Sequence, residues 1–158
     1  MKKQGKLEAV LWSIALPGFS QLLRGSYVKG VLFVLLEFVV NVMSNFNEAI
    51  MLSFLWEIDQ AFAVLDYQWL MFYPCLYMFA MWDAYRSAMP ETEEYSYLPF
   101  AFGAYFITVG LMLSKKVKIF GVVFGPIFLP MMFLVPGLLI GFVIRYLILR
   151  AKVPKVKF

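Results

Sequence analysis

The sequence predicts an all-helical, polytopic membrane protein: about four transmembrane helices, a broken N-terminal segment and an interfacial amphipathic helix, in one membrane domain over residues 1–158. The first reason is composition, because 63% of the 158 residues are hydrophobic and only 15% are charged, against about 25% in soluble domains. The second reason is that apolar runs alternate with short polar or basic stretches. A chain this apolar cannot cover its surface with polar groups, so lipid is its expected solvent.

The first apolar segment, residues 7–23, is interrupted at Pro17-Gly18. Its uninterrupted part of about ten residues spans only ~15 Å as a helix, which is half of the hydrocarbon core. The segment therefore either crosses as a kinked, minimal-length helix or re-enters the side from which it came. We expect it to be retained, since no convincing small-x-small cleavage pattern follows it.

The next two segments differ in character. Residues 28–44 are predicted to cross the membrane and are apolar except for Glu37 and Asn41. Residues 46–65 contain acidic residues and no Lys or Arg, and their polar side chains recur at nearly helical spacing among apolar ones. That pattern predicts an amphipathic helix lying on a membrane face.

Three further transmembrane segments are predicted, over residues 69–88, 97–113 and 119–149. The first of them ends in Trp82-Asp-Ala-Tyr-Arg86, an aromatic and charged sequence typical of the membrane interface. The last is longer than the roughly 20 residues that one crossing needs, and it contains several Pro and Gly positions. We expect either one kinked helix or a broken one there.

The basic residues predict the orientation. If residues 7–23 re-enter without crossing, only Lys115, Lys116 and Lys118 of the 14 basic residues lie outside. If that segment crosses, Lys2, Lys3 and Lys6 move outside as well. The positive-inside rule therefore favours re-entry, with both termini in the cytoplasm. We expect the protein to be a multi-pass protein of the plasma membrane.

Two stretches resemble the bacterial TM-two domain family. They are Leu16-Pro-Gly-Phe-Ser-Gln21 with Arg24-Gly-Ser-Tyr-Val-Lys-Gly30, and Asp83-Ala-Tyr85 near the end of a later helix. The family pattern is P-G-x-G-Q-x-Y-x-G, then K-G, and later D-A-Y. The match covers residues 6–40 and 82–86, with Ser20 in place of a glycine and Leu23 in place of an aromatic residue. The resemblance implies two apolar segments around a glycine-rich turn, and no common enzymatic activity.

The same motif has a physical interpretation that needs no family. The candidate residues are Pro17, Gly18, Gln21, Arg24, Gly25, Lys29 and Gly30. The Pro-Gly break frees backbone groups that need partners in lipid, and the glutamine amide can supply them. The later glycines allow a tight turn and close helix approach, and the two cations can attract anionic phospholipid. A structural hairpin and a site for a lipid headgroup or a partner both fit.

Charged residues near the helix ends form a further set of candidates. Asp83 and Arg86 are expected to anchor the interface, paired with each other or with Lys29. Arg145 is either a cation that reaches to the interface or a partner of Glu37. Such pairs fix the depth of a helix and do not by themselves indicate a reaction.

Glu37 and Asn41 are the candidate intramembrane polar site. A carboxylate near the middle of an apolar segment costs a few kcal/mol to insert, and Asn41 lies one turn away on the same helix face. One interpretation is an ion, proton or substrate site. The other is structural, with a protonated or hydrogen-bonded Glu37 that satisfies the backbone of a broken segment.

The residue inventory limits the functions that can be considered. The chain has no histidine and a single cysteine, which excludes Cys/His zinc sites, His-dependent triads and intrachain disulfides. We expect no catalytic residue, cofactor or metal, and no nucleic-acid partner, because the basic residues lie at the ends and in short loops. The sequence thus favours a non-enzymatic membrane component that binds membrane lipids, another membrane protein or a second copy. The alternative is a small channel or transporter subunit that uses Glu37.

Overall fold

The computed structural model describes residues 5–89 and 93–152, and it confirms the all-helical class. Within those residues there is no strand, only an isolated bridge between Ile119 and Val122. The helices are α1 (Lys6–Ala15), α2 (Phe19–Leu23), α3 (Tyr27–Met43), α4 (Phe46–Phe54), α5 (Ile58–Val64), α6 (Tyr67–Leu70), α7 (Tyr73–Ser87), α8 (Leu98–Leu113) and α9 (Gly125–Lys152).

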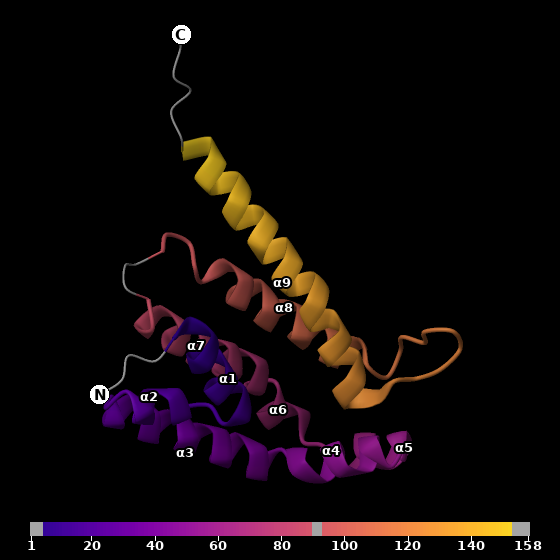
Figure 1. Ribbon diagram of the computed structural model, residues 1–158. Coiled ribbons are helices and arrows are strands. Elements are labelled where there is room, and N and C mark those ends of the chain that lie inside the picture. Colours follow the sequence, from indigo (N-terminus) through magenta and orange to yellow (C-terminus); the bar gives the residue numbers. More distant parts are fainter. Residues whose placement is uncertain (1–4, 90–92, 153–158) are drawn as a thin grey trace.

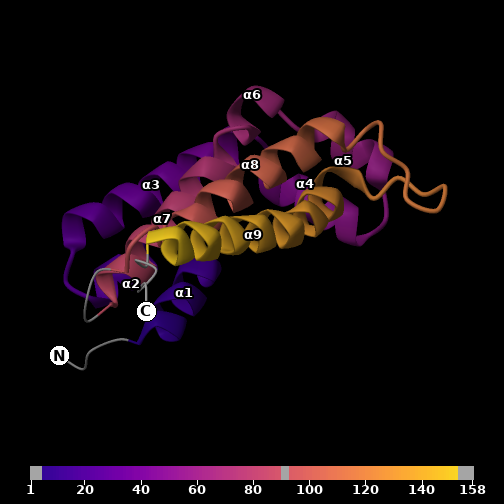
Figure 2. The same ribbon diagram turned by 90° about the horizontal axis from the view of Figure 1, so that it is seen from above.

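Helix α7 is the centre of the arrangement, because it packs against α1, α3 and α8. Helices α8 and α9 run side by side as a long pair, with α9 on the far side of α8 from α7 in Figure 1. The N-terminal end of α9 also contacts α4 and α5. Seen from above in Figure 2, α3 and α1 lie on opposite sides of α7, and the loop before α9 projects from one end of the molecule.

The N-terminal segment is broken, as its Pro-Gly sequence predicts. Helix α1 ends at Ala15, and the short helix α2 begins at Phe19 after Gly18, whose φ is +97°. Proline lacks the N–H that would continue the first helix. The carbonyl oxygen of Ile14, near the end of α1, accepts a hydrogen bond from the hydroxyl of Tyr77 in α7.

Residues 46–65 differ from the single helix predicted for them, since they form the separate helices α4 and α5. Trp56 has a φ of +63°, its N–H bonds to Ser53 O, and Glu57 N–H bonds to Leu52 O. These bonds form a Schellman motif, which ends a helix at a residue in the left-handed conformation. The indole of Trp56 packs against Phe124 and Phe128, and these contacts offset the cost of a left-handed conformation at a non-glycine residue.

The helices of the C-terminal half have boundaries that differ from those of the predicted segments. Residues 69–88 contain the end of α6 and all of α7, because Pro74 in the first turn of α7 suits the start of a helix and not its interior. Residues 119–149 contain a turn and then one continuous helix, α9, which runs through Pro130 and Pro136 to Lys152. Of the alternatives left open for that segment, the structure shows the single helix.

Close contact between α8 and α9 depends on glycine. A Cβ atom placed on Gly141 would lie 2.5 Å from Pro99 Cα, and one on Gly137 would lie 2.8 Å from Phe102 O. On α8, a Cβ on Gly110 would lie 2.9 Å from Pro130 Cα. Gly137 and Gly141 are four residues apart, the G-x-x-x-G spacing that lets helix backbones approach closely in membranes.

One helix of the described chain, α9, is by itself long and apolar enough to cross a membrane. Only 28% of its most apolar stretch is buried within the fold, so it is not enclosed as a core helix would be. Helices α3 and α4 meet the same criterion as a pair but are bent by 65° relative to each other, and α8 is apolar but shorter.

Candidate functional site

A cavity of about 670 Å³ lies among α1, α4, α6, α7, α8 and α9. Its lining consists of aliphatic, aromatic, methionine and proline side chains, and the hydroxyl groups of Tyr73, Tyr77 and Tyr85 are the only side-chain oxygen atoms that these residues carry. The volume lies within the range of small-molecule sites, about 300–1,000 Å³. Such a lining suits a hydrocarbon chain better than a polar metabolite.

Three of the surrounding helices contribute apolar stripes to this cavity. The stripes are Val10 and Ile14 on α1, Tyr77, Met81 and Tyr85 on α7, and Leu134, Leu138 and Phe142 on α9. Members of each stripe are four residues apart, so they lie on one face of their helix. The same face continues to Lys6 at the start of α1 and to Arg145 toward the end of α9. Each stripe therefore ends in a polar residue.

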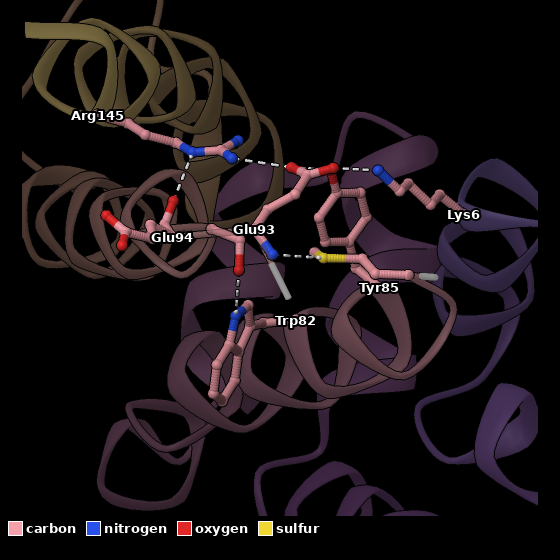
Figure 3. Close-up of polar contacts among 8 residues, drawn as sticks. Lys6, Trp82, Tyr85, Glu93, Glu94 and Arg145 are labelled. Atoms are coloured by element: carbon pink, nitrogen blue, oxygen red, sulfur yellow. Dashed lines mark hydrogen bonds and ion pairs between the residues drawn. The ribbon is translucent and has the colours of Figure 1, made fainter. Parts of the chain in front are cut away.

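The three polar residues meet at Glu93, in the connection between α7 and α8 (Figure 3). The Lys6 ammonium pairs with Oε1 of Glu93, and Arg145 Nη2 donates to Oε2 at 2.8 Å. The hydroxyl of Tyr85 also donates to Oε2, at 3.2 Å. Arg145 Nε donates to the backbone oxygen of Glu94 at 3.0 Å. We call Lys6, Tyr85, Glu93 and Arg145 the polar cap of the cavity.

The polar cap carries a surplus of positive charge. The hydrogen bonds from Lys6 and Arg145 lower the pKa of the Glu93 carboxyl from 4.5 to about 2, so Glu93 is ionised at neutral pH. One carboxylate thus faces two cations. Arg145 is only 17% exposed in its side chain and lies beside the apolar end of the cavity, so its charge is less screened than that of a surface arginine.

We expect the stability of the folded protein to fall in acid partly through Glu93. Because its carboxyl is more acidic in the folded chain than in the unfolded chain, Glu93 contributes stability above about pH 4.5, and this contribution is lost as the pH falls toward 2. Glu93→Gln should lower the melting temperature at pH 7 and reduce its decline between pH 5 and pH 3. Melting followed by circular dichroism in detergent measures both effects.

The matched control is Glu94→Gln, because Glu94 pairs with the exposed Lys152 at 2.8 Å and faces solvent. Exposed pairs contribute little to stability, so the acid-induced decline should remain as in the wild type. An unchanged decline in Glu93→Gln would contradict the assignment of this part of the acid sensitivity to Glu93.

The residues of the glycine-rich motif form a second polar network at the same end of α7. Gln21 is buried, and its Nε2 donates to Ala80 O at 2.9 Å and to Asp83 Oδ2 at 3.1 Å. Lys29 Nζ pairs with Asp83 Oδ1 at 2.8 Å, and Arg24 donates to the backbone oxygen of Ser87. The two stretches that carry the family resemblance therefore contact each other directly.

Glycine at three motif positions is required by geometry. Gly18 has a positive φ, and a Cβ there would lie 2.4 Å from Gly30 O. A Cβ on Gly30 would lie 2.6 Å from the Leu22 side chain. Gly25, with a φ of +82°, ends α2 in a Schellman motif, because Ser26 N–H bonds to Gln21 O. Pro17 occupies the break before α2.

Arg86 has a partner other than those expected for it, and Glu37 contacts Tyr73 in addition to the expected Asn41. Arg86 lies over the ring of Trp82, 5.3 Å from its centroid, while Asp83 pairs with Lys29. Glu37 is half-buried and accepts long hydrogen bonds, at 3.4 Å from Asn41 Nδ2 and at 3.5 Å from the Tyr73 hydroxyl. Since Arg145 pairs with Glu93, the suggested pairing of Arg145 with Glu37 was wrong.

Sequence reasoning placed Lys6 and Arg145 near the membrane interface and missed their common partner. A signal for them was present. Lys6 lies four residues before Val10 and Arg145 lies three residues after Phe142, so each extends an apolar stripe of its helix. Glu93 had no such signal, because it is one of several acidic residues in a polar loop.

Three comparisons add no family assignment to this geometry. No protein-family model, no curated protein and no solved structure matches the chain.

Proposed function

We propose that this protein is a non-enzymatic integral membrane component that binds membrane lipid in the cavity. The cavity itself carries the proposal, because its lining is hydrocarbon and aromatic and lies between helices with large apolar side chains on their outer faces. Leu7 on α1, Met112 on α8 and Leu139 on α9, for example, are each at least 60% exposed. An apolar surface of this extent is costly in water and favourable in lipid.

Four crossings and a cytoplasmic location of both termini are part of the proposal. Helix α9, and the bent α3–α4 pair if it forms a single crossing, are long and apolar enough to cross a membrane, and α8 is apolar but shorter. The contacts of Lys6, Arg24, Lys29 and Arg145 bring four cations to one end of the helices, around Asp83, Ser87 and Glu93. We propose that this end faces the cytoplasm, in accord with the positive-inside rule.

Filling the cavity tests lipid binding directly. Leu138 lines the cavity, whereas its neighbour Leu139 is 60% exposed on the outer side of the same helix. We expect Leu138→Trp to occupy space that lipid uses and to lower the amount of phospholipid retained after purification in mild detergent by about half or more. Leu139→Trp, the matched control, should retain as much as the wild type. Native mass spectrometry measures bound lipid per chain.

The proposal fails if the purified wild-type protein retains no lipid, or if both tryptophan variants retain the wild-type amount. Circular dichroism of each variant verifies that it is folded, and Leu138→Phe supplies a smaller filling group if the tryptophan variant does not fold. A graded loss, with phenylalanine between leucine and tryptophan, is the expected result.

A further inference from the structure

We infer that the polar cap is an anion site that selects the phosphate of an anionic phospholipid whose acyl chain occupies the cavity. This inference rests on the proposed lipid binding and adds the headgroup class. The three apolar stripes converge on the cap, so a lipid chain that fills the cavity has its polar end within reach of Lys6 and Arg145.

Arg145 has hydrogen-bonding capacity to spare. A guanidinium carries five N–H donors, and among the described residues Arg145 uses Nε toward Glu94 O and Nη2 toward Glu93. Its Nη1 has no acceptor in that part of the chain. Planar donors of this kind match the oxygen atoms of a phosphate.

The cap has the charge that an anionic headgroup requires. Two cations contact one carboxylate, and Glu94, the other acid among the described residues of the loop, pairs with Lys152 at 2.8 Å. A zwitterionic headgroup would bring its own cation toward Lys6 and Arg145, so its electrostatic attraction to the cap would be weaker. The site therefore favours a headgroup with net negative charge.

Glu93 has the role of an internal competitor in this arrangement. Its carboxylate occupies the position between Lys6 and Arg145 that a phosphate would take, and the Tyr85 hydroxyl bonds to it as well. Removing its charge frees both cations without removing either. An anionic lipid should consequently bind more tightly when Glu93 is neutralised, which is the opposite of what a purely structural role predicts.

The test compares two phospholipids with identical dioleoyl chains, phosphatidylglycerol and phosphatidylcholine, added to the full-length protein in detergent after its own lipid has been removed. We expect the wild type to bind phosphatidylglycerol about tenfold more tightly by native mass spectrometry. Arg145→Gln should abolish this preference, because it should weaken phosphatidylglycerol binding more than phosphatidylcholine binding. Glu93→Gln should increase phosphatidylglycerol binding severalfold.

Lys29→Gln is the matched control, because Lys29 also pairs with a carboxylate at the same end of the molecule, on Asp83. The preference should survive this change. Its loss in Lys29→Gln, or weaker phosphatidylglycerol binding in Glu93→Gln, would overturn the assignment. Inorganic phosphate should not displace the lipid; displacement would indicate a site for free anions and would also overturn it.

The outcomes separate this inference from the proposed function. If the wild type binds both lipids equally and Leu138→Trp binds neither, lipid binding in the cavity is supported and headgroup selection by the cap is excluded. Binding of neither lipid would exclude both. If Arg145→Gln does not fold, Arg145→Lys keeps the charge and removes the planar donors, and it should give an intermediate preference.

Discussion

Replacing Gly141 by alanine is expected to separate α9 from α8 and to lower the free energy of unfolding by about 3 kcal/mol. The added Cβ would lie 2.5 Å from Pro99 Cα, 2.7 Å from Leu98 O and 2.8 Å from Pro99 N. All three are backbone atoms that no side-chain rotation can move. Alanine gains about 1 kcal/mol over glycine in helix propensity, and the steric cost exceeds that gain.

Gly103→Ala is the matched control in the same helix pair. A Cβ there would meet only side-chain atoms, at 3.2 Å from Leu134, 3.3 Å from Leu138 and 3.4 Å from Met78. These side chains can adjust, so we expect a change smaller than about 1 kcal/mol. Unfolding titrations in mixed detergent measure both variants, and an equal loss at the two positions would contradict the close backbone contact.

Gly18→Ala is expected to be the other severe substitution, lowering the free energy of unfolding by about 4 kcal/mol. Two costs combine at this position. The φ of +97° disfavours any residue with a Cβ, and that atom would lie 2.4 Å from Gly30 O. The break between α1 and α2 would have to open, which would move Gln21 away from Asp83. The same unfolding titration measures the loss.

Substitutions at two other glycines measure the backbone cost and the steric cost separately. Gly121 has a φ of +81° but no atom within 4 Å of an added Cβ, so Gly121→Ala should cost only about 1–2 kcal/mol. Gly30 lies within a helix, and its alanine variant carries the steric cost against Leu22 alone. If Gly18→Ala costs no more than Gly121→Ala, then the contact with Gly30 is not tight.

Long apolar runs were the most reliable signal in the sequence. Residues 28–44 and 97–113 agree with α3 (Tyr27–Met43) and α8 (Leu98–Leu113) to within one residue. Local chemistry also predicted the break at Pro17-Gly18, because proline and glycine act on the chain irrespective of its tertiary contacts. Trp56 shows the limit of that reasoning. Tryptophan is not a helix-ending residue by propensity, and only its packing against Phe124 and Phe128 explains its conformation.

The candidate site was only partly predictable for a similar reason. Gln21, Lys29 and Asp83 belong to the same resemblance. The ion pair between Lys29 and Asp83 was one of the alternatives expected, whereas the hydrogen bond from Gln21 to Asp83 was not predicted. The cavity and its cap depend instead on the packing of six helices. Lys6, Glu93 and Arg145 come from three distant parts of the chain, and no local pattern relates them.

The Glu93 contacts also bear on the order in which the protein can be assembled. Lys6 is synthesised early, its carboxylate partner follows more than half-way along the chain, and Arg145 emerges near the end. Domains fold largely in step with synthesis. The side of the cavity that α9 forms is nevertheless missing until this last helix has been made. During translation the apolar faces of α1 and α7 are therefore open to the bilayer. Under the proposed lipid binding, a lipid would enter the space from the side before α9 closes it, so the cavity would acquire its occupant during biogenesis.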